Sequence, residues 1–331
     1  MVTFWWCLFG LLTCGYFALA GYDYGVGMLL PAFGGDEPRR RRVLGALGPF
    51  FLANEVWLIA AVGVLFGAFP HLEERLFSGA YVLVVTLLLG LVTFTASVQL
   101  RSRRPDARRG TWTFGIVAGA ALTAVSWGLF LGNLVRGLPL DAEGRPTGDL
   151  LALFHPYALV WGLGFVALFC LQGAVFLTVR GPAELTGRAR RLATAFLAPV
   201  LAFLVVAIAW GAFAIDGTSR FAFIAPLIAL VAFAVTAVAL RFKRHRLALL
   251  GAMALSAAPA IAVGTIRLPA ALVSSVDKGY ALSVEAAATA PETFTVLSYA
   301  GPAAVVVLLV VQWLTWRAHR DPVDDRSLLH F

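Results

Sequence analysis

The sequence contains little charge: only 13% of its 331 residues are Asp, Glu, Lys or Arg, whereas 60% are apolar. A soluble chain normally carries about 25% charged residues. This scarcity excludes a pair of soluble domains and an intrinsically disordered protein. Cysteine is also rare, and the three cysteines form no CxxC pair and no Cys/His cluster. A disulfide scaffold and a cysteine-based metal centre are therefore excluded, and a polytopic membrane protein remains.

Long apolar runs make up most of the chain, and nine of them reach the roughly 20 residues that a bilayer-spanning helix needs. Unbroken runs are typical of helices, because a membrane β-barrel shows alternating segments of about 10 residues. We therefore predict an all-α polytopic membrane protein, with a single membrane domain over 1–331. No basic residue precedes the first run, which favours a span over a signal peptide. The expected helices are 4–33, 44–70, 76–100, 111–135, 152–179, 191–215, 221–240, 247–266 and 292–316, with a tail over 317–331.

The basic residues are distributed unevenly around these nine helices, and the formal net charge is +8. Twenty of the 26 lie in alternate connections or in the tail, in the clusters 39–42, 101–109, 180–191, 241–246 and 317–326. The positive-inside rule then predicts an outer N-terminus and a cytoplasmic C-terminus. The positive charge thus indicates topology in a lipid bilayer, and no nucleic acid is expected as a partner.

Two acidic residues, Asp23 and Glu55, fall inside predicted spans on consecutive helices. Counted from the short connection between these helices, each lies ten or eleven residues deep, or about 15 Å. Helices joined by a short connection are usually neighbours, so this arrangement allows the two carboxyl groups to face one another. Intramembrane acids are functional candidates. Such a pair could hold or relay a proton, and the alternative is that each acid hydrogen-bonds a neighbouring helix or subunit.

Two further polar residues in or near the spans have structural interpretations. Gln172 is a mid-membrane amide, and an interhelical hydrogen bond is worth roughly 0.6 kcal/mol there. His155 begins the fifth predicted helix on the outer side, whereas Met28 lies near the inner side. An axial haem pair needs two ligands at matching depth, so His155 is expected to be an interfacial polar anchor. No metal site is predicted.

Several segments carry a family resemblance, in order from about residue 16 to residue 316. They include GYDYGVGMLLP (21–31), GPFFLANEVWL (48–58), LGNLVRGLPL (131–140) and LQGAVFLTVR (171–180). Together they resemble subunit II of the cytochrome bd-type quinol oxidases. The resemblance implies two four-helix bundles, formed by the first four and the next four helices, and one additional helix.

The resemblance also implies a heterodimer in the bacterial cytoplasmic membrane, with or without a small accessory subunit. Subunit I would carry haem b558, haem b595 and haem d, oxidise quinol and reduce O2 to water. This chain would have no catalytic residue and no obligatory cofactor. It would pack on subunit I and contribute to proton or oxygen access.

One departure from the family pattern affects the expected mechanism. The family commonly has an aspartate where this chain has Leu52. Glu55 lies three residues further on, on the same helix face. Our hypothesis is that Asp23, Asn54 and Glu55 carry any remaining proton route. Trp57 matches a family tryptophan near an apolar oxygen path, and packing is the alternative role.

Two other classes of protein fit the pattern of spans. A secondary transporter would use Asp23 and Glu55 for proton coupling, and a structural or assembly protein would do no redox or transport work. Transporters often show internal repeats with broken helices near mid-membrane. Here the intramembrane acids lie only in the first half of the chain, which favours the oxidase subunit.

Overall fold

The computed structural model describes residues 1–33, 36–103, 109–147, 150–215, 217–319 and 321–323. The elements in chain order are α1 (Val2–Leu29), η1 (Leu30–Phe33), α2 (Glu37–Leu47), α3 (Phe51–Ala68), α4 (Pro70–Gly79), α5 (Tyr81–Arg103), α6 (Arg109–Arg136), η2 (Leu150–Phe154), α7 (Pro156–Arg180), η3 (Ala183–Leu185), α8 (Thr186–Ala214), α9 (Ile224–Arg241), α10 (His245–Thr265), β1 (Ala270–Leu272), η4 (Lys278–Tyr280), β2 (Leu282–Ser283) and α11 (Pro291–Ala318). Within these ranges, nine helical segments are long and apolar enough to cross a membrane, which confirms the predicted number.

The predicted helix 44–70 is wrong as a single element. It is divided into the end of α2 and the whole of α3 by a turn over 48–50. Pro49 lies in this turn, and proline interrupts a helix because it has no N–H to donate and its ring clashes with the preceding turn. Glu55 consequently lies four residues from the start of α3, about 6 Å along its axis. The count of eleven helical residues between the connection and Glu55 is therefore wrong, and the depth of Glu55 in the membrane stays a prediction.

The predicted helix 76–100 begins too early, because residues 76–79 belong to α4. This short helix starts at Pro70 and buries Leu72 and Leu76. It also carries three consecutive charged residues, Glu73, Glu74 and Arg75, which favour the surface over the membrane interior. The other predicted helices occur with ends within five residues of those expected.

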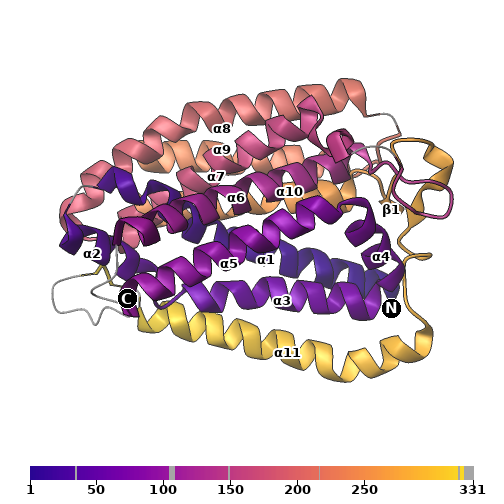
Figure 1. Ribbon diagram of the computed structural model, residues 1–331, viewed down its shortest axis with the longest axis horizontal. Helices are drawn as coiled ribbons and strands as arrows, with labels where there is room; N and C mark the ends of the chain where they lie inside the picture. The colour runs from indigo at the N-terminus through magenta and orange to yellow at the C-terminus, as the bar shows by residue number, and fades with distance from the viewer. Residues whose placement is uncertain (34–35, 104–108, 148–149, 216, 320, 324–331) are drawn as a thin grey trace.

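The first helix, α1, lies at the centre of the helix packing. It packs against α3, α6, α7 and α10 (Figure 1). Helices α7 to α10 also pack on one another, as do α5 and α6. Because α1 contacts helices from both expected groups, the division into two four-helix bundles stays a prediction.

The contact between α1 and α7 depends on two glycines. A Cβ atom on Gly25 would collide with the Phe169 carbonyl group, and one on Gly173 would collide with the backbone at Gly25. Small residues at such a crossing allow the two backbones to approach closely, which is how membrane helices gain packing contacts.

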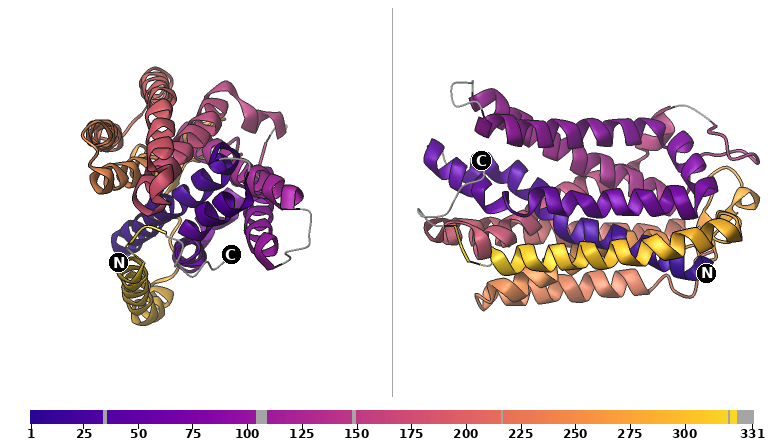
Figure 2. Two further views of the ribbon diagram at one scale, coloured as in Figure 1. Left: turned by 90° about the vertical axis from the view of Figure 1, so that its left-hand side faces the viewer. Right: turned by 90° about the horizontal axis from the view of Figure 1, so that it is seen from below.

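The last helix, α11, lies at the edge of the molecule (yellow in Figures 1 and 2). Only 6% of the most apolar 18-residue stretch of this helix is buried within the chain. It packs mainly on α3, and its Trp316 ring also contacts Tyr22 of α1 and Phe176 of α7. Most of α11 therefore presents an apolar surface outward.

The two ends of the molecule differ in charge and in structure. At one end, Arg101 pairs with Glu37 at 2.7 Å, and Arg42 pairs with Glu184 at 2.9 Å. Figure 1 shows α2 and the last turns of α11 at this end, which we call the arginine end, and the N-terminus and α4 at the other. The opposite end is covered by the connection that holds β1 and β2. There Ser274 Oγ donates to the Leu140 carbonyl at 2.6 Å.

Candidate functional site

A buried polar cluster joins α1 to α3 at two of the residues predicted for a proton route. Asp23 is 1% exposed and Asn54 is 0% exposed. The Asn54 Nδ2 group donates to Asp23 Oδ2 at 2.8 Å and to the Tyr22 hydroxyl at 2.8 Å. The structure therefore brings Asp23 and Asn54 into direct contact.

The cluster continues into α11 through Gln312, a residue that the sequence analysis missed. Gln312 Nε2 donates to Asn54 Oδ1 at 3.2 Å, and Gln312 Oε1 accepts from Trp57 Nε1 at 3.4 Å. The available signal was an amide inside the otherwise apolar run 303–314. This side chain anchors the peripheral helix α11 to the polar cluster.

One oxygen of the Asp23 carboxyl group is not used by the cluster. Oδ1 is buried and has no hydrogen-bond partner within the described residues. A buried acceptor without a donor is costly. It is a position where a water molecule or a proton can bind, which is the chemistry that a proton route requires.

Glu55, the third predicted route residue, points to a different neighbour. Its Oε1 accepts from Thr95 Oγ1 of α5 at 3.0 Å. The side chain is half-buried and lines a surface groove together with Thr95 and Gln99. Successive residues of a helix point about 100° apart, so Asn54 can face Asp23 while Glu55 faces α5. The expected facing of Asp23 and Glu55 is therefore replaced by two separate contacts.

A second hydroxyl cluster lies on α1 and was also missed by the sequence analysis. Tyr16 and Tyr24 share a hydrogen bond of 2.9 Å, and Trp127 Nε1 of α6 donates to the Tyr16 hydroxyl at 3.1 Å. Both tyrosines are 0% exposed. With Asp23 and Tyr22, they place four buried polar side chains within three turns of α1.

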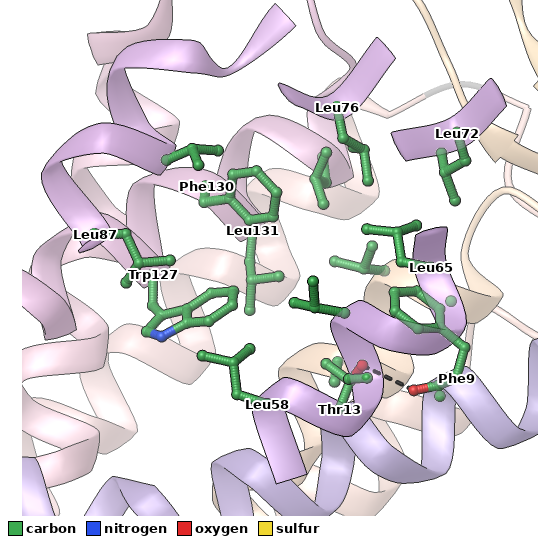
Figure 3. A pocket seen from close by; sticks show the side chains of 18 of the residues that line it. Phe9, Thr13, Leu58, Leu65, Leu72, Leu76, Leu87, Trp127, Phe130 and Leu131 are labelled. Atoms are coloured by element: carbon green, nitrogen blue, oxygen red, sulfur yellow. Dashed lines mark hydrogen bonds between the residues drawn. The ribbon is translucent and has the colours of Figure 1, made fainter. Parts of the chain in front are cut away.

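Trp57 lies against α1, where its ring occupies the space that a Cβ atom on Gly15 would need. The neighbouring residue Leu58, rather than Trp57, lines an apolar cavity of about 370 Å³. Figure 3 shows this cavity, with Phe9, Trp127 and Leu131 among the side chains around it. The choice between an oxygen path and packing for Trp57 stays a prediction.

Gln172 forms the interhelical hydrogen bonds expected of a mid-membrane amide. Its Nε2 donates to the Ala18 carbonyl of α1 at 2.6 Å, and its Oε1 accepts from Ser256 Oγ of α10 at 2.6 Å. Gln172 therefore joins three helices, α1, α7 and α10, and both ends of its amide are paired.

The structure gives His155 a helix-capping role, in keeping with the interfacial polar anchor expected from the sequence. His155 Nδ1 accepts from the Ala158 N–H at 3.2 Å and caps α7. The adjacent cavity is lined by Arg136, Pro156, Tyr157, Trp210 and Ile215 besides His155. An axial pair needs a second ligand such as His, Met or Cys, and the described lining has none. Groups of three or more His, Cys, Asp or Glu side chains that could hold a metal ion are likewise absent from the described ranges.

Comparison with known proteins gives matches over nearly the whole chain. Residues 1–319 match the family described as cytochrome bd terminal oxidase subunit II. The chain is 30% identical over 333 residues to cytochrome bd ubiquinol oxidase subunit 2 of Bacillus subtilis, with 98% of this chain and 97% of that protein covered.

Two further matches agree with this family. Cytochrome bd-I ubiquinol oxidase subunit 2 of Escherichia coli is 34% identical over 220 residues, which cover 64% of this chain and 58% of the length of that relative. The fold is similar to a chain of the bd oxidase from Geobacillus thermodenitrificans. The TM-score is 0.75 at 17% identity, and 96% of this chain and 98% of that chain are covered. The family expected from the sequence is thus confirmed, and the chain belongs to the cytochrome bd terminal oxidase subunit II family.

Proposed function

We propose that this chain is the second subunit of a bd-type quinol oxidase in the bacterial cytoplasmic membrane. The family match over residues 1–319 carries this proposal. In such a complex, subunit I holds haem b558, haem b595 and haem d, oxidises quinol and reduces O2 to water. This chain packs on subunit I and supports access of protons or oxygen.

The proposed topology has the N-terminus outside and the C-terminus in the cytoplasm. The basic clusters in alternate connections support it, because Lys and Arg are retained on the cytoplasmic side of a membrane. The arginine end, with the pairs Arg101–Glu37 and Arg42–Glu184, is then the cytoplasmic end. The N-terminus lies at the opposite end, as Figure 1 shows.

We further propose that Asp23, Asn54 and Glu55 form the proton route of this subunit. The route has an interior part, in which Asn54 hydrogen-bonds Asp23, and a peripheral part, in which Glu55 lies in its surface groove. Asn54 and Glu55 are consecutive, so a single residue step on α3 separates the two parts. Leu52, at the family aspartate position, is 56% exposed and cannot carry a proton.

Co-expression with the candidate subunit I, followed by purification through a tag on this chain, tests the assignment. An oxidase subunit should retain a haem-bearing partner with visible absorbance and quinol-dependent O2 consumption. The same chain expressed alone should bind no haem. A colourless protein that couples proton flux to solute uptake through Asp23 and Glu55 would instead establish the transporter.

A further inference from the structure

A polar cavity lies where α6 ends and α7 begins, at the end of the molecule opposite the arginine end. Its volume is about 340 Å³. It is lined by Arg136, His155, Pro156, Tyr157, Trp210 and Ile215. None of the residues of the proposed proton route lines this cavity, and no role has yet been assigned to it.

The hydrogen bonding of His155 determines which ring nitrogen can bind a ligand. Nδ1 accepts from the Ala158 N–H, so in the neutral ring the proton lies on Nε2. The Nε2 atom is buried and has no hydrogen-bond partner among the residues that the structure describes. Burial, together with the nearby positive charge of Arg136, lowers the pKa of His155 to about 4. At neutral pH the ring is therefore an uncharged donor with an unused N–H.

Among the described residues that line this cavity, the fixed charge is of one sign. Arg136, the last residue of α6, is exposed and supplies a fixed positive charge beside the His155 donor. No Asp or Glu occurs among the described residues that line this cavity or the apolar cavity next to it. An anionic group is therefore the complementary ligand.

The second cavity is apolar and lies between α7, α8, α9 and α10, with a volume of about 300 Å³. Tyr157 lines both cavities. Gly211 of α8 lines the apolar cavity, and Ile215, the residue directly after α8, lines the polar one. A ligand that fits both cavities needs an anionic head joined to an apolar chain.

We propose that the two cavities form a binding site for one anionic phospholipid. The phosphate accepts from His155 Nε2 and Arg136, and an acyl chain occupies the apolar cavity. The position supports a lipid, because the start of a membrane-spanning helix lies at the level of the headgroups. Trp210, which is 40% exposed, is the type of side chain found at that level.

Native mass spectrometry of the purified two-subunit oxidase tests this site. The complex is exchanged into detergent that contains phosphatidylglycerol or phosphatidylcholine with the same acyl chains. Wild type should retain one phosphatidylglycerol molecule that Arg136→Gln and His155→Asn retain about tenfold more weakly, because each removes a hydrogen bond to a charged group. Asparagine can keep the helix cap, so His155→Asn removes only the Nε2 donor. Ala225→Leu, which fills the apolar cavity, should also weaken retention.

Arg220→Gln is the matched control, because Arg220 is an exposed arginine at the same end and lines neither cavity. An unchanged haem spectrum in every variant shows that the complex is intact. Equal retention of phosphatidylcholine, equal retention by Arg136→Gln and the control, or displacement by millimolar inorganic phosphate would overturn the proposal. A neutral isoprenoid quinone found in place of the phospholipid would also overturn it.

Discussion

The side-chain amide of Asn54 donates to the carboxyl group of Asp23 across 2.8 Å and thereby joins α3 to α1. The same amide group accepts from Gln312 on α11. Asn54 is thus the residue through which three helices share one polar cluster, and the predictions for this cluster follow from its central place.

The first prediction concerns the energy of this cluster. Asn54→Leu leaves Asp23, Tyr22 and Gln312 without their common partner, so it should destabilise the complex by about 1–3 kcal/mol. Gln312→Leu removes only the contacts to α11 and should cost less. In a double-mutant cycle, the coupling between Asn54 and Gln312 should be about 0.6 kcal/mol, as for other membrane hydrogen bonds. Thermal unfolding in detergent measures these values. An equal loss of unfolding free energy in Asn54→Leu and Gln312→Leu would show that Asn54 is not the central residue of the cluster.

The second prediction tests the peripheral part of the proton route. Glu55→Gln keeps the size of the side chain and removes its proton-exchanging group. Oxidase turnover and proton uptake should fall on the order of a hundredfold, the scale of a lost proton-transfer group. Thr95→Val removes the hydrogen bond at 3.0 Å but leaves the carboxyl group in place, and it should have a much smaller effect. Unchanged turnover and proton uptake in Glu55→Gln would refute the route.

The third prediction is a rescue of that variant. Leu52 lies three residues before Glu55 on α3, and its side chain is 56% exposed within this chain, so an aspartate there clashes with no packed neighbour of the same chain. Leu52→Asp combined with Glu55→Gln should recover much of the turnover, because positions three apart share one helix face. Leu52→Asn in the same background is the control without a proton-exchanging group. Recovery by both substitutions would show that polarity, rather than proton transfer, is what this face requires.

The fourth prediction concerns the crossing of α1 and α7. Gly173→Leu would force the backbones apart at Gly25, where a Cβ atom has no room. Overpacking costs typically about 1–3 kcal/mol and can be larger where the contact is with backbone. The yield of assembled complex should therefore fall sharply. Gly10→Leu, on α1 where nothing lies within 4 Å of an added Cβ atom, should assemble normally. If Gly173→Leu and Gly10→Leu both failed to assemble, the failure could not be attributed to the crossing of α1 and α7.

The fifth prediction is a pH dependence of stability that comes from His155. Its pKa is lowered to about 4 in the folded chain, against about 6.5 when unfolded. Between these values the unfolded state binds more protons, so stability should fall as the pH falls from about 6.5 toward 4. In lipid-free detergent the unfolding temperature of wild type should drop over this range more than that of His155→Asn. Identical pH profiles for wild type and His155→Asn would show that protonation of His155 does not cause the loss of stability.

The hydropathy of the sequence is sufficient to identify the membrane spans. A run of about 20 apolar residues can satisfy its backbone in a bilayer only as a helix, so the nine spans follow from composition and spacing alone. Counting those spans also predicts the side of the membrane on which each basic cluster lies. The ordered motifs around Asp23 and Glu55 were enough to indicate the family, which the comparisons confirm.

The direction in which each polar side chain points required the tertiary structure. Hydropathy does not reveal the turn at Pro49, because the apolar run continues through it, and the position of Glu55 along its helix depends on that turn. Nor does sequence spacing place Gln312 beside Asn54, since 258 residues separate them. The packing of α1 against α3 determines that Asn54 meets Asp23, and Glu55, about 100° further round the helix, consequently faces α5. Local sequence specifies a helix and its length, whereas its rotation and its neighbours depend on contacts with the rest of the chain.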